Sequence, residues 1–557
     1  MKRALPLIGV LVLLTNASGQ APSGYLTWVD KETGLTTFVP KAYKEIPLQP
    51  TESVDRVKLI CKTVPRELRQ LRARPTMRVF LFRWTDGAAT TPGDPGNKPD
   101  PEANVPTSIR EMMEKSKEVK SFDDFKKKKL AGFEIEPVKG QEGVYELSMK
   151  RGPRDRAASR SGWLIIKRQG AAAYGVYAFT VRAHQKAMKR LATKVARHLK
   201  LPEGKKAAAA KGKVERALDR LYRNKKYRHI EHRREVRKDL ARGWKAADTE
   251  NYILVYHTKN TKLINRIAKN IEGIRSYYEK LFPPAREVTA VSIVRICANK
   301  GEYHAYGGPQ GSGGFWHSGN EELVLFDYMQ TTLDAERNRE RMKQKVSDKD
   351  ALLVLYHEAF HQYIYYAVGE VAPHDWFNEG HGDFFSGAVI ASNGKKVTRI
   401  RPSWWRIHRA KDQMEKGKGR VSLKDLLVAE RKDYYGPRRS DFYAAGWSFV
   451  YFMRNSDVVA GNDEWNGLLD LYFNTLKDEY QKAIERFGPA DAAEGEQAKP
   501  GQGTNMGFKR MAQREAKAKA INKMMDGLDI PTLDGKWEKF IKKLRDPWPE
   551  RRARRRD

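Results

Sequence analysis

Hydrophobic and polar positions follow the clearest pattern in the second half of the chain. Short apolar runs over Asn251–His257, Val288–Cys297 and Glu321–Asp327 have the length of β-strands. Between the first two runs, residues Lys262–Leu281 repeat apolar side chains at helical spacing, at Leu263, Ile267, Ile271, Ile274 and Tyr278. A glycine-rich loop over residues 301–319 precedes the third run. This order predicts a small sheet with a helix on one face.

The N-terminal half has weaker strand patterns. Strands are predicted over Tyr25–Val29, Leu35–Val39, Met77–Phe82, Gly143–Ser148, Trp163–Ile166 and Gly175–Val181, and a helix over Ala183–Leu199. We expect residues 22–200 to form an α/β region of unknown role, residues 201–249 a basic helical linker, and residues 250–545 a second domain. The chain is therefore predicted to be a multidomain α+β protein.

Charge adds a question about partners. The 557 residues carry a formal net charge of +36, concentrated in Arg182–Arg242 and in the tail over residues 546–557. A basic helical face is most often a solvated face, and attraction to an anionic cell-surface polymer or lipid is the sharper alternative. No recognition motif accompanies the charge, so specific binding of nucleic acid is not expected.

The first 21 residues are interpreted as a secretory signal peptide. Lys2 and Arg3 precede an apolar run from Ala4 to Leu14 that is too short to span a membrane, and small residues follow it. We therefore expect a secreted, periplasmic or cell-envelope protein without a transmembrane segment in the mature chain. Cys61 and Cys297 lie in different predicted domains within apolar runs, which favours two buried thiols over a disulfide.

The strongest chemical signal is a His-Glu-x-x-His pattern in a segment predicted to be a helix from Asp348 to Ala367. On a helix, positions four apart share a face, so His357 and His361 point at one spot. Neutral imidazoles at such a spot suit Zn²⁺. Glu358 is turned off the axis of these two ligands but can reach the water that the metal activates, which favours a role as general base.

A second helical segment, which begins after Pro373, contains two further candidates. Glu379 can supply a third ligand, and Asp383 lies four residues later on the same face, where it can accept the second ring N–H of a ligand histidine. Three protein ligands and one open position are typical of a catalytic zinc site. The sequence therefore predicts one Zn²⁺ per chain, with His374 as the substitute ligand for Glu379.

The His-Glu-x-x-His pattern followed by Asn378-Glu379-x-x-x-Asp383 resembles the gluzincin metallopeptidases, the thermolysin-like superfamily. The resemblance covers residues 250–545 and implies a small mixed sheet with an edge strand, followed by a helical zinc-binding subdomain. It extends to the Tyr-Ala-Ala-Gly run that begins at Tyr443, because a similar tyrosine stabilises the oxyanion in the aminopeptidase branch of the family.

The family's edge strand pairs with the backbone of the substrate. The glycine loop, with Gly313 and Gly314, and the run that contains Leu323 and Val324 resemble that strand, which implies a role for these four residues in substrate binding.

The sequence also departs from the family. Seventeen residues separate His361 from Glu379, slightly fewer than in other members, and the Gly-x-Met-Glu-Asn segment that holds a substrate amino terminus is absent. His381 replaces a small or apolar residue and is expected to face away from the metal. The missing segment favours endopeptidase over aminopeptidase activity.

These patterns together predict an exported zinc metallopeptidase that acts on peptides or proteins. The alternative is a surface-associated binding protein that uses the basic segment and has a weak or vestigial peptidase domain. The intact Glu358 argues against this alternative. Of the other histidines, His304 and His317 flank the glycine loop, where they are either solvated or line the cleft, and His257 is expected to be structural.

Overall fold

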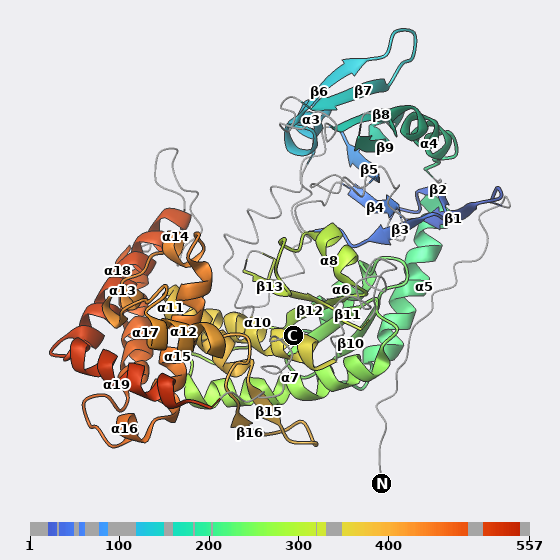
Figure 1. Cartoon of the computed structure of the whole chain (residues 1–557). Coiled ribbons are helices and arrows are strands. Elements are labelled where there is room, and N and C mark those ends of the chain that lie inside the picture. The colour runs from blue at the N-terminus through green and yellow to red at the C-terminus, as the bar shows by residue number, and fades with distance from the viewer. Residues whose placement is uncertain are drawn as a thin grey trace, which may run out of the picture. The chain divides into compact units, whose positions relative to one another are not determined.

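The computed structural model describes residues 21–30, 33–49, 55–61, 77–86, 119–149, 160–181, 184–201, 204–318, 320–329, 348–487 and 505–545 (Figure 1). The predicted multidomain α+β class is confirmed. One compact unit comprises residues up to Ala247 with Val255–His257 and Gly301–Gly308, and the other comprises the remaining described residues. Residues 1–20 of the predicted signal peptide, which ends at residue 21, and the basic tail over residues 546–557 lie outside the described residues.

The first unit is built on a seven-stranded antiparallel sheet. Its strands, in spatial order, are β3 (Tyr43–Ile46), β4 (Asp55–Cys61), β5 (Arg78–Thr85), β9 (Ala172–Val181), β8 (Arg160–Gln169), β7 (Val144–Met149) and β6 (Phe133–Pro137). A separate hairpin pairs β1 (Tyr25–Val29) with β2 (Thr36–Pro40). The six strands predicted in this half of the chain correspond to β1, β2, β5, β7, β8 and β9, whereas β3, β4 and β6 were not predicted.

Alternation along the strands gives this sheet two apolar faces. On β5, Val79 and Leu81 belong to the core that α4 (Gln185–Arg197) covers, whereas Phe80 and Phe82 belong to the core that contains Phe125 of α3 (Phe122–Lys129). Successive side chains of a strand point to opposite faces, so a strand that is apolar at every position must be buried on both sides.

The segment predicted as a basic helical linker forms two helices. Helix α5 (Gly204–Tyr222) is followed by α6 (Ile230–Lys238), and His229 between them has a left-handed backbone with φ of 50°. Arg234 of α6 forms ion pairs with Glu215 at 2.8 Å and Asp219 at 2.7 Å of α5. Part of the positive charge is therefore neutralised within the segment itself.

A five-stranded mixed sheet precedes the helices of the candidate site in the chain. Its order is β10 (Lys245–Asp248), β11 (Tyr252–Tyr256), β12 (Ser292–Cys297), β14 (Glu322–Phe326) and β13 (Gly314–His317). Strands β12 and β14 are parallel, and β13 and β14 are antiparallel. The glycine-rich stretch is therefore not a plain loop, because it contains helix α8 (Lys300–Tyr306) and the edge strand β13.

The predicted helix over residues 262–281 is confirmed as α7 (Thr261–Leu281). All five of its apolar positions named above are completely buried. The side chain of Asn260 caps the helix by accepting the N–H of Leu263 at 3.1 Å. The helix therefore lies where periodicity and capping both place it.

The long helix α10 (Asp348–Val368) is the central element of the second unit. It contacts α7, β13 and β14 as well as α11 (Asp375–Phe385) and α17 (Leu468–Phe487) (Figure 1). The hairpin of β15 (Ala388–Ile390) and β16 (Val397–Ile400) follows α11. The remaining helices are α12 (Ile407–Lys416), α13 (Leu423–Leu427), α14 (Arg431–Tyr434), α15 (Arg439–Asn455), α16 (Asp457–Ala460), α18 (Asn505–Met525) and α19 (Ile530–Lys543).

Aromatic packing fixes α10 and α11 against each other and against α7. The ring of Phe282, which follows α7, contacts Phe360 of α10 and both Phe377 and His381 of α11. Phe360 also contacts Phe385, and Phe377 contacts His381, which is completely buried. Such ring clusters contribute strongly to burial and restrict the relative movement of the helices. Among the described residues, no helix combines the length and apolar character that a membrane crossing requires.

Candidate metal centre

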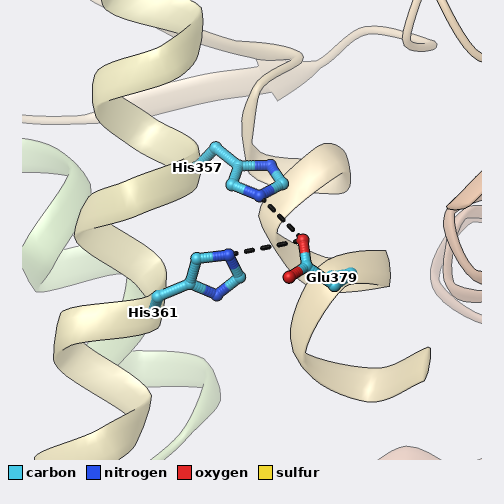
Figure 2. A group of neighbouring side chains, drawn as sticks. All are labelled: His357, His361 and Glu379. Atoms are coloured by element: carbon cyan, nitrogen blue, oxygen red, sulfur yellow. Dashed lines mark hydrogen bonds and ion pairs between the residues drawn. The ribbon is translucent and has the colours of Figure 1, made fainter. Parts of the chain in front are cut away.

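Two histidines of α10 and one glutamate of α11 converge on a single point. Nε2 of His357 lies 3.1 Å from Oε2 of Glu379, and Nε2 of His361 lies 3.5 Å from the same oxygen (Figure 2). Each residue offers one ligand atom, and these atoms all lie within 4.8 Å of one another. The four-residue spacing on α10 brings both rings to the face that α11 covers, as Figure 2 shows.

Hydrogen bonds on the far side of each ring fix which of its two nitrogens carries the proton when the ring is neutral. Nδ1 of His357 lies 3.4 Å from Oδ1 of Asp383, and Nδ1 of His361 lies 2.8 Å from Oδ1 of Asn378. Both partners are acceptors, so Nδ1–H of each ring donates to them, and in the neutral ring the Nε2 lone pair faces Glu379. Two lone pairs and a carboxylate around one point attract either a proton or a metal ion, and imidazole and carboxylate are ligands that suit Zn²⁺.

Asp383 is itself held in place from the other side. Arg406 donates through Nε to Oδ2 of Asp383 at 2.6 Å, and the indole N–H of Trp405 donates to Oδ1 at 3.3 Å. Burial alone would raise the pKa of Asp383, but the charges and hydrogen bonds of Arg406 and His357 together outweigh burial, and the pKa is lowered. The carboxylate therefore stays ionised and remains an acceptor for His357.

The charges of the three candidate ligands are mutually dependent. Burial lowers the pKa of His357, but its hydrogen bonds to Asp383 and Glu379 outweigh burial and hold the pKa well above the ordinary value of 6.5. Burial raises the pKa of Glu379, but the two histidines outweigh burial and hold it well below its usual range. The carboxylates thus attract a positive charge to this point, and a proton or a metal ion can meet that demand.

Glycines let the two helices approach closely enough to form this group. A Cβ on Gly382 would lie 2.8 Å from Cε1 and 2.9 Å from Nδ1 of His357. A Cβ on Gly380 would lie 2.7 Å from the carbonyl oxygen of Gly446, on α15. Real Cβ atoms essentially never come this close, so glycine at 380 lets α11 contact α15, and glycine at 382 leaves room for the His357 ring.

Glu358 faces the edge strand of the sheet. The backbone N–H of Trp316, on β13, hydrogen-bonds to its carboxylate. A Cβ on Gly314 would lie 3.1 Å from Cγ of Glu358 and 2.6 Å from a methyl group of Val354, and a Cβ on Gly313 would overlap the hydroxyl of Tyr328. Burial raises the pKa of Glu358, although the neighbouring histidines oppose the shift. A raised pKa brings a carboxylate nearer to the range that a general base needs.

Leu323 and Val324 lie on an inner strand rather than on the edge strand that the resemblance implied. Both residues lie on β14, which has β12 on one side and β13 on the other: Leu323 is opposite Val294 and Trp316. Both are completely buried, and their backbone is enclosed in the sheet. The edge strand is β13 instead. The apolar run over residues 323–326 was misleading, because a strand paired on both sides is more uniformly apolar than an edge strand.

Tyr443, on α15, lies in a small cluster beside the candidate ligands. Its hydroxyl hydrogen-bonds to Tyr435, and the guanidinium of Arg406 lies 4.7 Å from the centre of its ring. Burial, and next the charge of Glu379, raise the pKa of Tyr443 above its usual range. The phenol therefore keeps its proton and can donate it in a hydrogen bond.

The residues of this neighbourhood that the sequence patterns did not indicate include Asn378, Arg406 and Tyr435. Asn378 was visible next to Glu379 but was given no role. Arg406 and Tyr435 follow Glu379 by 27 and 56 positions, and only the folded chain shows that they lie near the ligands. No local pattern marks either of them.

The other histidines do not join the group. His374 is bound to the hydroxyl of Tyr472 through Nδ1 at 2.7 Å, and burial lowers its pKa to about 3. His381 donates from Nδ1 to the carbonyl oxygen of Phe377 at 2.9 Å, within the aromatic cluster and away from the ligands. His257 pairs with Glu302 at 2.9 Å, His304 with the carbonyl oxygen of Gly308 at 2.9 Å, and His317 with the backbone N–H of Asn320 at 3.0 Å.

Cys61 and Cys297 do not form a disulfide. Cys297 is completely buried, as expected, whereas Cys61 is partly exposed, because it ends β4. Neither cysteine contributes to the candidate metal group, which consists of imidazole and carboxylate donors.

Comparison with known proteins adds little to this site. No protein-family model and no curated protein matches the sequence. The solution structure of cyanobacterial PsbP (CyanoP) from Synechocystis sp. PCC 6803 matches with a TM-score of 0.20 and 10% sequence identity, over 34% of this chain and 99% of that chain. A TM-score this low supports no inference about fold or function.

Proposed function

We propose that this protein is a zinc-dependent metallopeptidase of the gluzincin type, with endopeptidase more favoured than aminopeptidase activity. The observation that carries the proposal is the convergence of His357, His361 and Glu379 with each ring Nδ1 held by an acceptor. Three protein donors leave a coordination position open, which is typical of catalytic rather than structural zinc. A bound Zn²⁺ would polarise the scissile carbonyl. It would also lower the pKa of a water molecule, so that the water can lose a proton near neutral pH and attack the carbonyl carbon.

Glu358 is the proposed general base. Its carboxylate lies on the same helix as the two histidines but is directed at the backbone of Trp316, so that it stands beside the ligands without being one. The hydrogen bond from Trp316 fixes the orientation of the carboxylate. Glu358 would accept a proton from the attacking water and pass it to the leaving amine.

Tyr443 is the proposed donor to the oxyanion. Its phenol is protonated and belongs to a cluster that is anchored to Glu379 through Tyr435. A preoriented hydroxyl stabilises the negative charge that develops on the carbonyl oxygen, because it needs little reorganisation during the reaction. Gly313 and Gly314 leave room for the side chains of Tyr328, Val354 and Glu358 beside the edge strand, and the backbone of the substrate would lie along that strand.

The proposal includes export, through the basic and apolar residues at the N-terminus, and attraction to anionic surface polymers through the basic segment. These two parts rest on the sequence alone. Neither is needed for the chemistry at the candidate metal centre, so the peptidase can be tested without them.

Hydrolysis of an unstructured protein tests the proposed function. Purified protein incubated with a casein-like substrate should release peptides, a strong chelator should stop the release, and added Zn²⁺ should restore it. Hydrolysis that continues at the same rate after the metal has been removed would contradict a metal-dependent mechanism.

A further inference from the structure

Tyr435 contacts the candidate ligand Glu379 on the oxygen that the histidines do not use. Its hydroxyl donates to Oε1 of Glu379 at 2.5 Å, whereas Oε2 faces His357 at 3.1 Å and His361 at 3.5 Å. The two carboxylate oxygens therefore have different partners. One of them points at the proposed metal position, and the other is occupied by a phenol.

This division matters because a carboxylate can bind a metal through one oxygen or both. The side chain of Glu379 is only 7% exposed, so water cannot readily replace the hydrogen bond that Oε1 would lose without the phenol. Without a donor on Oε1, the group would lower its energy by rotating, and both oxygens could turn toward the cation. The phenol of Tyr435 opposes that rotation.

Tyr435 is held by its own neighbours. The guanidinium of Arg431 lies 4.4 Å from the centre of its ring, and Arg431 also pairs with Asp375 at 3.3 Å. The ring of Tyr443 packs edge-on against it at 6.1 Å. These contacts fix the ring from two sides and leave the hydroxyl directed at Glu379.

Core packing does not explain this residue. Tyr435 is 41% exposed and follows the short helix α14, whereas the neighbouring Tyr434 is completely buried. An exposed ring whose one polar atom reaches a buried carboxylate contributes little to the hydrophobic stability of the fold. Its hydroxyl contributes instead to the geometry of the ligand.

We propose that Tyr435 is a positioning residue that holds Glu379 as a one-oxygen ligand and thereby sets the affinity of the site for its metal. This inference rests on the proposed metal site, but it does not depend on which reaction the site performs. Partners in the outer shell of a metal site typically change metal affinity by about 10- to 100-fold. The hydroxyl of Tyr435 is assigned an effect of this size.

The test compares the full-length protein with Tyr435→Phe, which removes the hydroxyl and keeps the ring. The dissociation constant for Zn²⁺ alone is measured by competition with a chromophoric chelator, and visible spectra of the Co²⁺-loaded proteins report the number of ligands. Tyr277→Phe, at a partly exposed tyrosine of α7 outside the ligand group, is the matched control. Thermal unfolding of the metal-free proteins reports on the fold.

The expected result is zinc binding about 10- to 100-fold weaker in Tyr435→Phe, with an altered Co²⁺ spectrum, while Tyr277→Phe matches the wild type in both. The unfolding temperature of metal-free Tyr435→Phe should stay near that of the wild type. An unchanged dissociation constant and spectrum would overturn the inference, as would a loss of affinity explained by unfolding of the metal-free variant.

The same series separates this inference from the proposed function. Wild-type protein that binds zinc, loses affinity with Tyr435→Phe and hydrolyses nothing would contradict the peptidase but support the role of Tyr435. Wild-type protein that binds no more zinc than His357→Ala would overturn the metal site, and with it both proposals.

Discussion

Replacement of Gly382 by alanine tests the packing beside the metal group more sharply than removal of a ligand would. The added Cβ would lie 2.8 to 3.0 Å from three atoms of the His357 ring, all closer than ordinary contact. Non-bonded carbon atoms prefer about 3.5–4.0 Å, so the ring must retreat by roughly 0.5 Å or more. Functional groups tolerate about that much displacement before their geometry fails. We expect zinc affinity to fall by about tenfold or more.

The effect on stability results from two opposing terms. Alanine stabilises a helix interior by about 0.8–1.0 kcal/mol relative to glycine, whereas overpacking a filled site costs about 1–3 kcal/mol. These terms partly cancel, so we expect the metal-free variant to lose no more than about 2 kcal/mol. Chelator competition measures the affinity, and denaturant unfolding of the metal-free protein measures the stability.

Gly535→Ala is the matched control for this experiment. It lies in helix α19, and a Cβ there would have no atom within 4 Å. We expect the unfolding free energy to rise by about 0.5–1 kcal/mol without a change in zinc affinity. Equal zinc affinity in Gly382→Ala, Gly535→Ala and the wild type would refute the close packing of α11 against His357.

Four further predictions follow from the same site. His357→Ala or His361→Ala should each abolish stoichiometric zinc, measured by metal analysis of the purified protein; full retention in either would contradict the ligand assignment. Glu358→Gln should keep its zinc, because Glu358 is not a ligand, while hydrolysis is lost; a loss of zinc would make it a ligand instead. Tyr443→Phe should keep its zinc and lower kcat by about 10²–10³, and unchanged turnover would leave Tyr443 a packing residue. Zinc affinity should strengthen as the pH rises past 6.5, because the raised pKa of His357 means that zinc must displace a proton; affinity independent of pH from 6 to 8 would contradict that shift.

Local sequence patterns predicted the elements of this fold well. The apolar repeat over residues 262–281 and the His-Glu-x-x-His segment correspond to α7 and α10 within one or two residues at each end. Helix α7 buries one apolar face, whereas every residue of α10 over 350–368 is buried or half-buried, and both patterns follow from the apolar positions in the sequence. The helix that contains Glu379 could be placed after Pro373 for a similar reason, since proline is poorly tolerated inside a helix.

The pairing of strands could not be predicted from local sequence patterns. The short segment Gly314–His317 looked like part of a loop, but it forms the edge strand, and the more apolar run over residues 322–326 is an inner strand. The order of strands in a sheet depends on contacts between distant residues. The apolar character of a run therefore indicates burial but not its place in the sheet.

The outer contacts of the site were the least accessible from the sequence. Asp383 could be proposed because it shares a helix face with Glu379, whereas Arg406 and Tyr435 reach the ligands from separate segments. Helical spacing predicts neighbours within a helix only. Residues that tune a metal ligand from another element become visible only when the fold brings them together.

Cleavage by zinc-loaded wild type and zinc-loaded Glu358→Gln, measured side by side on the same unstructured protein, tests the central claim most directly. The two proteins share the ligands His357, His361 and Glu379 and differ only in the proposed general base. Both proteins should hold about one zinc per chain, and only the wild type should release peptides. Equal cleavage by the two proteins, or no cleavage by the loaded wild type, would contradict that claim.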